Sequence, residues 1–342
     1  MAYGDYPDEP YSGISNGDYF KKILVRANGV VEDFGLGVDK AKFIPMDGPD
    51  LMNPDFLSEE VEHSWYEYPN GTKTAHPSEG ITKPNYTGPK TGTKEHWEFL
   101  DETKKYSWIK SPTFKGKACE VGPLAKYIVV YTKVKQGIIS NPSWAEQMIV
   151  KQIDTVSSVL GVPAHVWMCS TVGRTACRAL DAQVAVNMSQ YMFNKLVANI
   201  KGGDEVVADM SKFDPNSWPK EAKGVGVLDA PRGALGHWSV IKDAKIDNYQ
   251  CIVPSTWNAC PKTMANEHGA YESNMIDTHV KIADKPLEIL KGIHSFDLAL
   301  LVQPTCTIRK VKKSSLLIRM LCANNRGDSY VRTTGKKAVS CI

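Results

Sequence analysis

The feature that most constrains the fold is an uninterrupted segment, Thr171 to Ile200, in which apolar side chains recur at every fourth position. The recurring residues are Ala176, Leu180, Val184, Met188, Met192 and Leu196. This spacing is typical of a helix, and the Gly202-Gly203 pair supplies a stop. Small and apolar residues also occupy the other faces, so we predict a long helix that is buried in a large core.

A second helix is predicted just before this one. Ser143 is followed three residues later by Glu146, which fits a capping box at a helix start. The apolar stripe that follows consists of Ile149, Ile153, Val156 and Leu160. A Gly-Val-Pro sequence then ends the helix. Two long helices joined by about ten residues favour an antiparallel pair within a bundle.

The rest of the chain has the pattern of strands and loops. Residues 1–95 are rich in Gly, Pro, Asn and Asp and predict short strands, such as Ile23–Arg26, between long loops. Val225–Leu228, Trp238–Lys242 and Tyr249–Val253 are strand-like, with a turn at Asp243–Asp247. We therefore predict an α+β fold class, mainly α with small β-hairpins.

Composition excludes several classes of protein. Apolar residues make up 42% of the chain and charged residues 23%, as in a soluble globular protein. No apolar stretch approaches the ~18 residues of a transmembrane helix. The polar, acidic start at Met1–Pro10 predicts no targeting signal. None of the eight cysteines forms a Cys-x-x-Cys pair, so we expect free thiols rather than a zinc or iron–sulfur site.

Charge divides the chain at residue 297. The segment Leu298–Ile342 holds nine basic residues and one acid, Asp328, for a net charge of +8, whereas the remainder carries −5. Such a tail can indicate a nucleic-acid arm. However, Tyr330 is its only aromatic residue, so the stacking platforms of single-strand binders are missing.

Three segments offer side chains for chemistry. Pro231 and Arg232 lie on a Gly-flanked loop at the mouth of the predicted hairpin, where the Arg232 guanidinium can face an anion or simply pair with Asp229. In Val253-Pro-Ser-Thr-Trp-Asn258, the two hydroxyls of Ser255 and Thr256 form either a hydrogen-bonding wall or an ordinary turn. Asp297 ends the His-Ser-Phe-Asp sequence and can form a charge-assisted pair with Arg232.

Together with other segments, these motifs resemble the large (catalytic) subunit of nickel–iron hydrogenases of the uptake, respiratory branch. The matching segments occur in the family's order and cover residues 1–297. They are His63-Ser-Trp-Tyr66, His76-Pro-Ser-Glu-Gly80, Pro84-Asn-Tyr-Thr-Gly88, Tyr106-Ser-Trp108, Glu120-Val-Gly-Pro-Leu-Ala125, Gly173-Arg-Thr-Ala176, Asp229-Ala-Pro-Arg-Gly-Ala-Leu-Gly-His-Trp238, Val253-Pro-Ser-Thr-Trp-Asn258, Gly269-Ala-Tyr-Glu272 and Ile293-His-Ser-Phe-Asp297.

The resemblance implies a helical fold around a central bundle, a nickel–iron centre with cyanide and carbon monoxide ligands, and oxidation of H2. Electrons would pass to an iron–sulfur small subunit. By motif match, Arg232 and Asp297 are the expected catalytic residues, and Pro231, Ser255 and Thr256 are expected to line the cofactor. The family implies no nucleic-acid partner, no direct membrane span, and a periplasmic or membrane-associated location through the small subunit.

Two departures from the family concern the metal. The resemblance implies four cysteine ligands, two from an Arg-x-Cys-Gly-x-Cys motif and two from Asp-Pro-Cys-x-x-Cys. The first motif is missing, and Asp297 is followed by Leu298-Ala-Leu-Leu-Val instead of the second. We therefore expect no metal ligands, no nickel–iron centre and no activity in this chain as written.

The second departure is consistent with a frameshift. Leu298 to Cys306 can be encoded as CTT GCC TTG CTT GTT CAG CCC ACA TGT, and one C restored after the Asp297 codon makes this sequence read Pro-Cys-Leu-Ala-Cys-Ser-Ala-His-Met. We therefore divide the chain into a family domain, residues 1–297, and an out-of-frame, disordered or non-native tail, residues 298–342. The alternative is a non-catalytic relative such as the quinone-side subunit of respiratory complex I, in which absent cysteines would be natural.

Overall fold

The structure is a computed structural model that describes residues 23–26, 29–46, 50–88, 103–211, 213–276, 278 and 287–297, together with four strands after residue 305. For β1 and the last four strands only the backbone is described. The helices of the described residues are α1 Pro123–Lys135, α2 Trp144–Leu160, α3 Ala164–Met168, α4 Thr171–Lys201, α5 Pro254–Asn258, α6 Ala270–Met275 and α7 Leu287–His294, with short 3-10 helices η2 Phe34–Leu36, η3 Asp50–Met52 and η5 Pro215–Ser217.

The strands form several sheets. Their bounds are β1 Ile23–Arg26, β2 Gly29–Glu32, β3 Lys42–Pro45, β4 Leu57–Glu60, β5 Tyr66–Glu67, β6 Thr74–Ala75, β7 Lys83–Pro84, β8 Ser111–Phe114, β9 Lys117–Glu120, β10 Glu221–Ala230, β11 Gly233–Lys242, β12 Lys245–Ile252, β13 Cys306–Arg309, β14 Leu316–Cys322, β15 Asn325–Thr333 and β16 Ala338–Cys341. The sheet orders are β3-β2-β1-β9-β8-β4-β6, β10-β11-β12, β13-β16-β14-β15 and β5-β7. β1 pairs with β9 in parallel, and β10, β11 and β12 are antiparallel.

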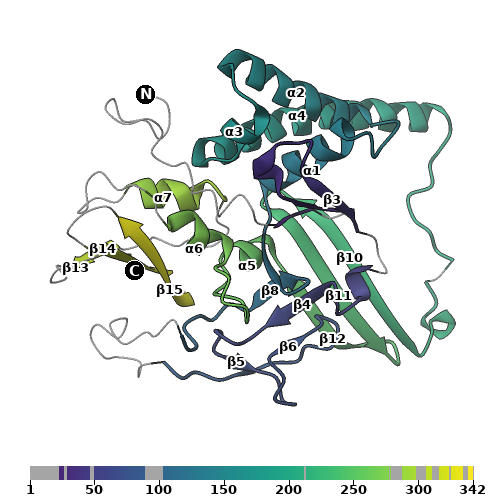
Figure 1. Ribbon diagram of the computed structural model, residues 1–342. Helices are drawn as coiled ribbons and strands as arrows, with labels where there is room; N and C mark the ends of the chain where they lie inside the picture. Colours follow the sequence, from purple (N-terminus) through teal and green to yellow (C-terminus); the bar gives the residue numbers. More distant parts are fainter. Residues whose placement is uncertain are drawn as a thin grey trace.

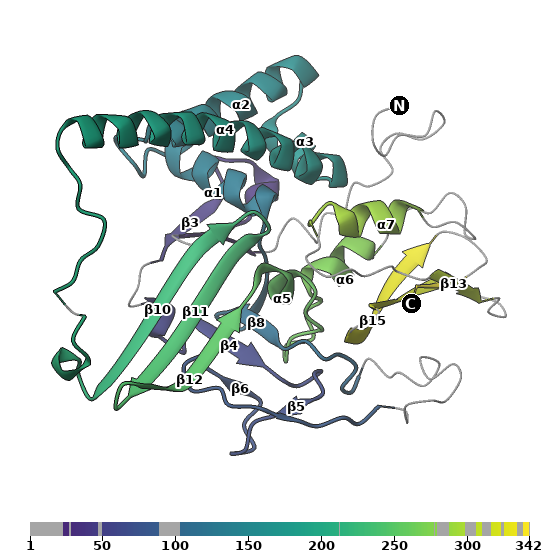
Figure 2. The same ribbon diagram turned by 180° about the vertical axis from the view of Figure 1, so that it is seen from behind.

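Helices and sheets occupy different regions of the molecule. Helices α1 to α4 gather at one end, and the β10-β11-β12 sheet and the shorter strands extend from them toward the other end (Figure 1). The reverse view shows the three long strands side by side (Figure 2). The loop that follows α4 runs along one side of these strands, and α5, α6 and α7 lie on the other side. Helix α1 lies between the other helices and the sheets, because it packs on α2, α4 and β1.

Local sequence signals explain where the helices begin. The predicted capping box is confirmed at α2, where Ser143 N donates to Glu146 Oε2 at 2.9 Å and the Ser143 hydroxyl accepts from Glu146 N. Ser170 caps α4, because its Oγ accepts from Gly173 N at 2.9 Å. Gly173 is required at this corner, since a Cβ there would overlap the carbonyl oxygens of Trp167 and Met168.

Two hydrophobic cores hold these elements together. The first lies among the helices and includes Phe34, Tyr127, Ile128, Ile153, Met168 and Cys177. The second joins β10-β11-β12 to the short strands and includes Leu51, Leu57, Phe114, Trp238 and Trp257. Trp238 is fully buried, and its Nε1 donates to the Leu51 carbonyl at 2.9 Å, so its polar atom is satisfied within the core.

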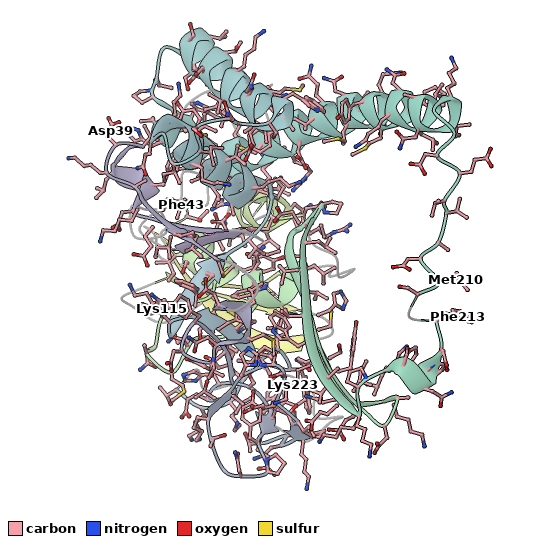
Figure 3. All side chains as sticks on the ribbon, turned by 90° about the vertical axis from the view of Figure 1, so that its right-hand side faces the viewer. Asp39, Phe43, Lys115, Met210, Phe213 and Lys223 are labelled. Carbon is pink, nitrogen blue, oxygen red and sulfur yellow. The ribbon has the colours of Figure 1, made fainter. Side chains whose placement is uncertain are left out.

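The prediction that the long helix is buried along its length is wrong for its second half. Helix α4 spans Thr171–Lys201 as expected, but its buried residues end at Val184. Beyond that point Val186 is 68% exposed, Phe193 60% and Leu196 56%. Figure 3 shows this half of the helix projecting past the rest of the molecule. An apolar pattern shows only that a helix is suited to burial. Among the described residues this half has few neighbours, such as the Trp144 ring, whose centre lies 5.8 Å from that of Tyr191.

The predicted α+β class is confirmed, because helices and several small sheets are both present. The expectation that the chain is mainly α is wrong for the described residues, because their strands hold about as many residues as their helices. The predicted helices at Ser143 and Thr171 and the three-stranded sheet are also present. The seven-stranded sheet was not anticipated, since most of its strands have four or fewer residues. The central bundle of the family fold stays a prediction. In the 298–342 tail only the backbone of β13–β16 is described, and the prediction that it is non-native lies otherwise outside the described residues.

Candidate functional site

The predicted functional arginine lies on a tight hairpin turn. Strands β10 and β11 pair up to Ala230 and Gly233, so Pro231 and Arg232 alone form the connection. Gly233 has a φ of +126°, and a Cβ on it would lie 2.5 Å from the Gly122 nitrogen. A glycine is therefore needed for the turn to pack against the start of α1, and this packing fixes where Arg232 leaves the backbone. Pro231 is exposed at the tip.

Arg232 and Asp297 are brought together as the sequence predicted. Arg232 Nε lies 3.9 Å from Asp297 Oδ1, with 43% and 29% of the two side chains exposed. Asp297 follows α7 and adopts a φ of +60°, which aspartate tolerates better than most residues. At this distance and exposure the pair adds little to stability. Its consequence is placement, because it brings a carboxylate and a guanidinium from two separate elements close together.

A second arginine, Arg178 of α4, was missed by the sequence reasoning. Its Nε lies 3.8 Å from Asp297 Oδ2, so the carboxylate is flanked by two guanidinium groups. Its Nη2 donates to the carbonyl oxygens of His294 at 3.0 Å and Ser295 at 2.7 Å. The available signal was its place four residues after Arg174 of the Gly-Arg-Thr-Ala segment, which puts both side chains on one helix face.

Ser255 and Thr256 lie on the short helix α5, where Pro254 occupies the first turn. Ser255 is buried and Thr256 partly exposed. Asn258 ties this helix to the β9–α1 junction, because its Oδ1 accepts from Val121 N at 3.0 Å and its Nδ2 donates to Val121 O at 2.8 Å. The neighbouring Gly122 touches the Arg232 turn, so α5 and the turn pack against the same junction.

A buried ion pair supports this junction from below. Arg174 is 1% exposed and Glu120 3%, and Arg174 Nε donates to Glu120 Oε1 at 2.7 Å. Arg174 Nη1 also donates to Asn274 Oδ1 at 3.1 Å, and its guanidinium lies 4.3 Å from the Phe296 ring centre. Glu120 is therefore a buried acid rather than a solvated charge. Arg174 of this pair also contacts Phe296, which directly precedes Asp297.

A second buried chain of polar groups lies nearby. The Tyr106 hydroxyl donates to Glu272 Oε1 at 2.9 Å, and His268 Nδ1 contacts Glu272 Oε2 at 2.8 Å. Burial, followed by the nearby Glu272 carboxylate, raises the pKa of Tyr106 well above its usual range. Tyr106 therefore remains a neutral donor, and this chain braces α6, which carries Asn274.

The described residues do not fit a nickel–iron centre. Cys119, Cys169, Cys177 and Cys260 are buried free thiols and Cys251 is a partly exposed one. Across the described ranges, no three or more His, Cys, Asp or Glu side chains are close enough together to hold a metal ion. Thiolates are the ligands that such a centre requires, and here they are not assembled around Arg232.

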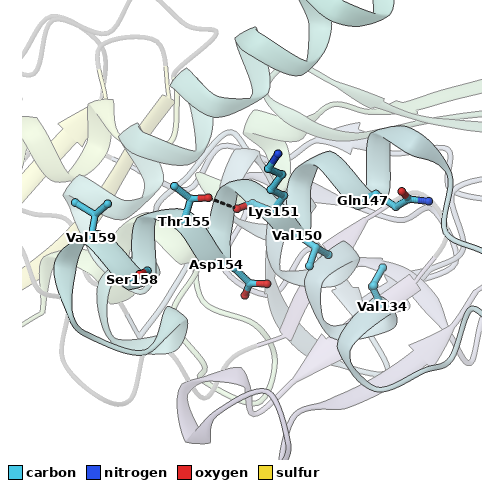
Figure 4. A pocket seen from close by; sticks show the side chains of 8 residues that line it. All are labelled: Val134, Gln147, Val150, Lys151, Asp154, Thr155, Ser158 and Val159. Atoms are coloured by element: carbon cyan, nitrogen blue, oxygen red, sulfur yellow. Dashed lines mark hydrogen bonds between the residues drawn. The ribbon is translucent and has the colours of Figure 1, made fainter.

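A groove on the helices lies away from these residues. It has a volume of about 590 Å³ and is lined by side chains of α2 together with Val134 near the end of α1 (Figure 4). Its polar groups bond among themselves and their neighbours: the Thr155 hydroxyl donates to the Lys151 carbonyl at 2.7 Å, and Asp154 pairs with Lys135 at 2.7 Å. Since the Arg232 turn packs on the opposite end of α1, the groove is separate from the candidate site.

Comparison with known proteins gives a consistent result. The family model described as nickel-dependent hydrogenase matches residues 1–301. The uptake hydrogenase large subunit of Bradyrhizobium diazoefficiens is 46% identical over 299 residues, which cover 87% of this chain and 46% of that protein. The hydrogenase-1 large chain of Escherichia coli is 41% identical over 298 residues, with the same two coverages.

Solved structures show the same relationship at the level of the fold. The Ni-Fe-Se hydrogenase from Desulfovibrio vulgaris Hildenborough matches with a TM-score of 0.52 and 25% identity, covering 82% of this chain and 53% of that one. The chain thus spans about half the length of the relatives it matches. In the part of the chain that the structure describes, no helix combines the length and apolar character that crossing a membrane requires.

Proposed function

Because this chain belongs to the nickel-dependent hydrogenase family, we propose that it carries part of the H2-oxidising site of a hydrogenase large subunit. Within this proposal Arg232 and Asp297 are the residues that act near the reacting atoms. Pro231, Ser255 and Thr256 line the place of the cofactor. The relatives matched at 41–46% identity bear the names of hydrogenase large subunits, which favours this function over that of a complex I relative.

The observation that carries the proposal is the pairing of Arg232 with Asp297. The two residues come from a hairpin turn and from the end of α7, and their side chains meet at 3.9 Å. A guanidinium is always charged and offers donors in a fixed plane, so once oriented it can stabilise developing negative charge without reorganising. Asp297 supplies the orientation and the balancing charge.

We further propose that this chain as written carries no nickel–iron centre. When bound in a complete family member, that centre would supply the cleavage of H2. The family match ends at residue 301, four residues after Asp297 and where the resemblance would place the second pair of cysteines. This supports the proposal that residues 298–342 are an out-of-frame tail beside a family domain of residues 1–297.

For the complete large subunit we infer an iron–sulfur small subunit as the partner that receives electrons. We also infer a periplasmic or membrane-associated location through that partner. Both follow from the family resemblance, and the words "large subunit" in the names of the relatives support a smaller partner subunit.

Elemental analysis tests the metal proposal directly. The purified 342-residue chain should contain nickel and iron far below one atom per chain, because the required thiolates are not assembled. Stoichiometric nickel in this chain would overturn the proposal. The DNA sequence around the Asp297 codon tests the frameshift, which fails if no single-base change there yields a Pro-Cys-x-x-Cys reading.

Mutation of Arg232 tests the site in a complete, frame-restored large subunit expressed with its small subunit. Arg232→Lys keeps the charge but loses the planar fork, and we expect H2-dependent dye reduction to fall by about 10²-fold or more with nickel content unchanged. Lys223→Met on the same hairpin is the control, since Lys223 makes only a long surface ion pair with Glu79. Turnover equal to wild type in Arg232→Lys would remove Arg232 from the mechanism.

A further inference from the structure

We propose that Arg178 is a positioning residue that aims the Asp297 carboxylate at Arg232. The inference rests on the proposed function of the Arg232–Asp297 pair and adds a residue from a third element, α4. Arg178 Nε lies nearest to Oδ2 of the carboxylate, whereas Arg232 Nε lies nearest to Oδ1.

Arg178 first fixes the backbone that carries Asp297. The last carbonyls of a helix have no partner within the helix, and they attract cations and donors. Helix α7 ends at His294, and Arg178 Nη2 donates to the carbonyls of His294 and Ser295 at 3.0 and 2.7 Å. The Asp297 amide donates to His294 O at 3.0 Å as well. The His294 carbonyl therefore accepts hydrogen bonds from both Arg178 and Asp297.

Arg178 then fixes the carboxylate itself. Its Nε lies 3.8 Å from Asp297 Oδ2, nearly the same as the 3.9 Å between Arg232 Nε and Oδ1. With one guanidinium on each oxygen, rotation of the carboxylate away from Arg232 would break the contact with Arg178. A single partner could not impose this restriction, because a lone Arg232 would follow the carboxylate.

The segment of α4 that carries Arg178 is held in place by a buried neighbour. It lies on α4 four residues after Arg174, whose guanidinium is buried against Glu120, Asn274 and the Phe296 ring. Residues four apart share one helix face. The helix thus uses two successive arginines on the same segment: Arg174 holds Phe296 from the core, and Arg178 holds Asp297 at the partly exposed edge.

Hydrogen exchange on the 342-residue chain tests this without any metal. The amides of Ser295, Phe296 and Asp297 are all hydrogen bonded to the preceding turn. In Arg178→Met the Asp297 amide should exchange at least about tenfold faster than in wild type, because its acceptor, the His294 carbonyl, is one of the two carbonyls that lose the Arg178 donor. Lys195→Met, an exposed cation farther along α4, is the matched control and should leave this segment unchanged. Unchanged exchange in Arg178→Met would overturn the proposal.

Turnover in the complete enzyme separates positioning from general stability. Arg178→Met should lower kcat about tenfold with the KM for H2 and the nickel content unchanged, and Arg178→Lys should recover part of the loss. In an Asp297→Asn background, Arg178→Met should have no further effect, because it acts through that carboxylate. Effects that multiply in the double variant would overturn positioning. If Asp297→Asn and Arg232→Lys were both fully active, the proposed function would fail. Hydrogen exchange in Arg178→Met would still test whether Arg178 anchors the backbone that carries Asp297.

Discussion

Replacing Arg174 by methionine probes the buried charge pair on which the site rests. The change removes the guanidinium that pairs with Glu120 at 2.7 Å, bonds to Asn274 at 3.1 Å and stacks 4.3 Å from the Phe296 ring centre. Since Glu120 is only 3% exposed, its carboxylate cannot be rescued by solvent. Methionine fills a similar space, so the variant tests charge more than cavity formation.

The expected loss of stability is large. Breaking a buried ion pair by removing one partner costs about 3–5 kcal/mol, because the other charge stays buried. Glu120→Leu should cost a similar amount, because the buried Arg174 charge loses its carboxylate partner. The double variant removes both charges at once, and such apolar replacements are often nearly neutral. The two single losses should therefore sum to far more than the loss in the double variant.

Urea unfolding monitored by tryptophan fluorescence measures these differences. With an m-value near 3 kcal/mol/M, each single variant should shift the midpoint down by about 1 to 1.7 M. The double variant should lie within about 0.5 M of wild type, since the coupling between contacting residues cancels most of the loss. Shifts in the double variant equal to the sum of the singles, or single shifts too small to detect, would show that the pair does not carry the junction.

Two further outcomes follow from buried titratable groups. Burial lowers the pKa of His76 from its ordinary 6.5, and its ring bonds to Ser78 and to the Leu51 carbonyl. As the pH falls, the unfolded chain therefore takes up the His76 proton before the folded chain does. The stabilisation from neutral, buried His76 is complete above about pH 6.5 and is lost at lower pH, so the urea midpoint should drop more between pH 7 and 5 in wild type than in His76→Gln. An equal drop of the midpoint in both proteins would contradict this. Burial also raises the pKa of Cys169 to about 12 and that of Cys177 further. At pH 8 iodoacetamide should label the partly exposed Cys251 before either of them, and rapid labelling of Cys177 in the folded chain would refute its burial.

Features encoded locally were predictable from the sequence. The Ser143–Glu146 capping box and the four-residue apolar spacing placed α2 and α4 correctly, because each signal is satisfied within one turn or one helix. The Arg232–Asp297 contact was also predicted, since the family motifs contain both residues. Its role in a reaction stays a prediction.

Features that depend on distant contacts were not predictable. The seven-stranded sheet joins strands of two to four residues, and β1 pairs with β9 far along the chain, so no periodic pattern marks it. Arg178 was missed because it donates to backbone carbonyls at and just after the end of α7, and backbone carbonyls carry no sequence signature. Burial of the second half of α4 was predicted wrongly, because hydrophobicity reveals the need for a neighbour and not its presence.

The bare half of α4 has a practical consequence for anyone who handles the isolated chain. Large continuous apolar surfaces are rare on monomeric soluble proteins and tend to drive association. With Val186, Phe193 and Leu196 each more than half exposed on one helix, the chain should sediment faster as its concentration rises. Sulfate salts should aggravate this, because they strengthen burial of apolar groups. In a cell, chaperones that bind exposed apolar segments would recognise the same surface. The lifetime of the chain would then depend on how soon another polypeptide covers this half of α4.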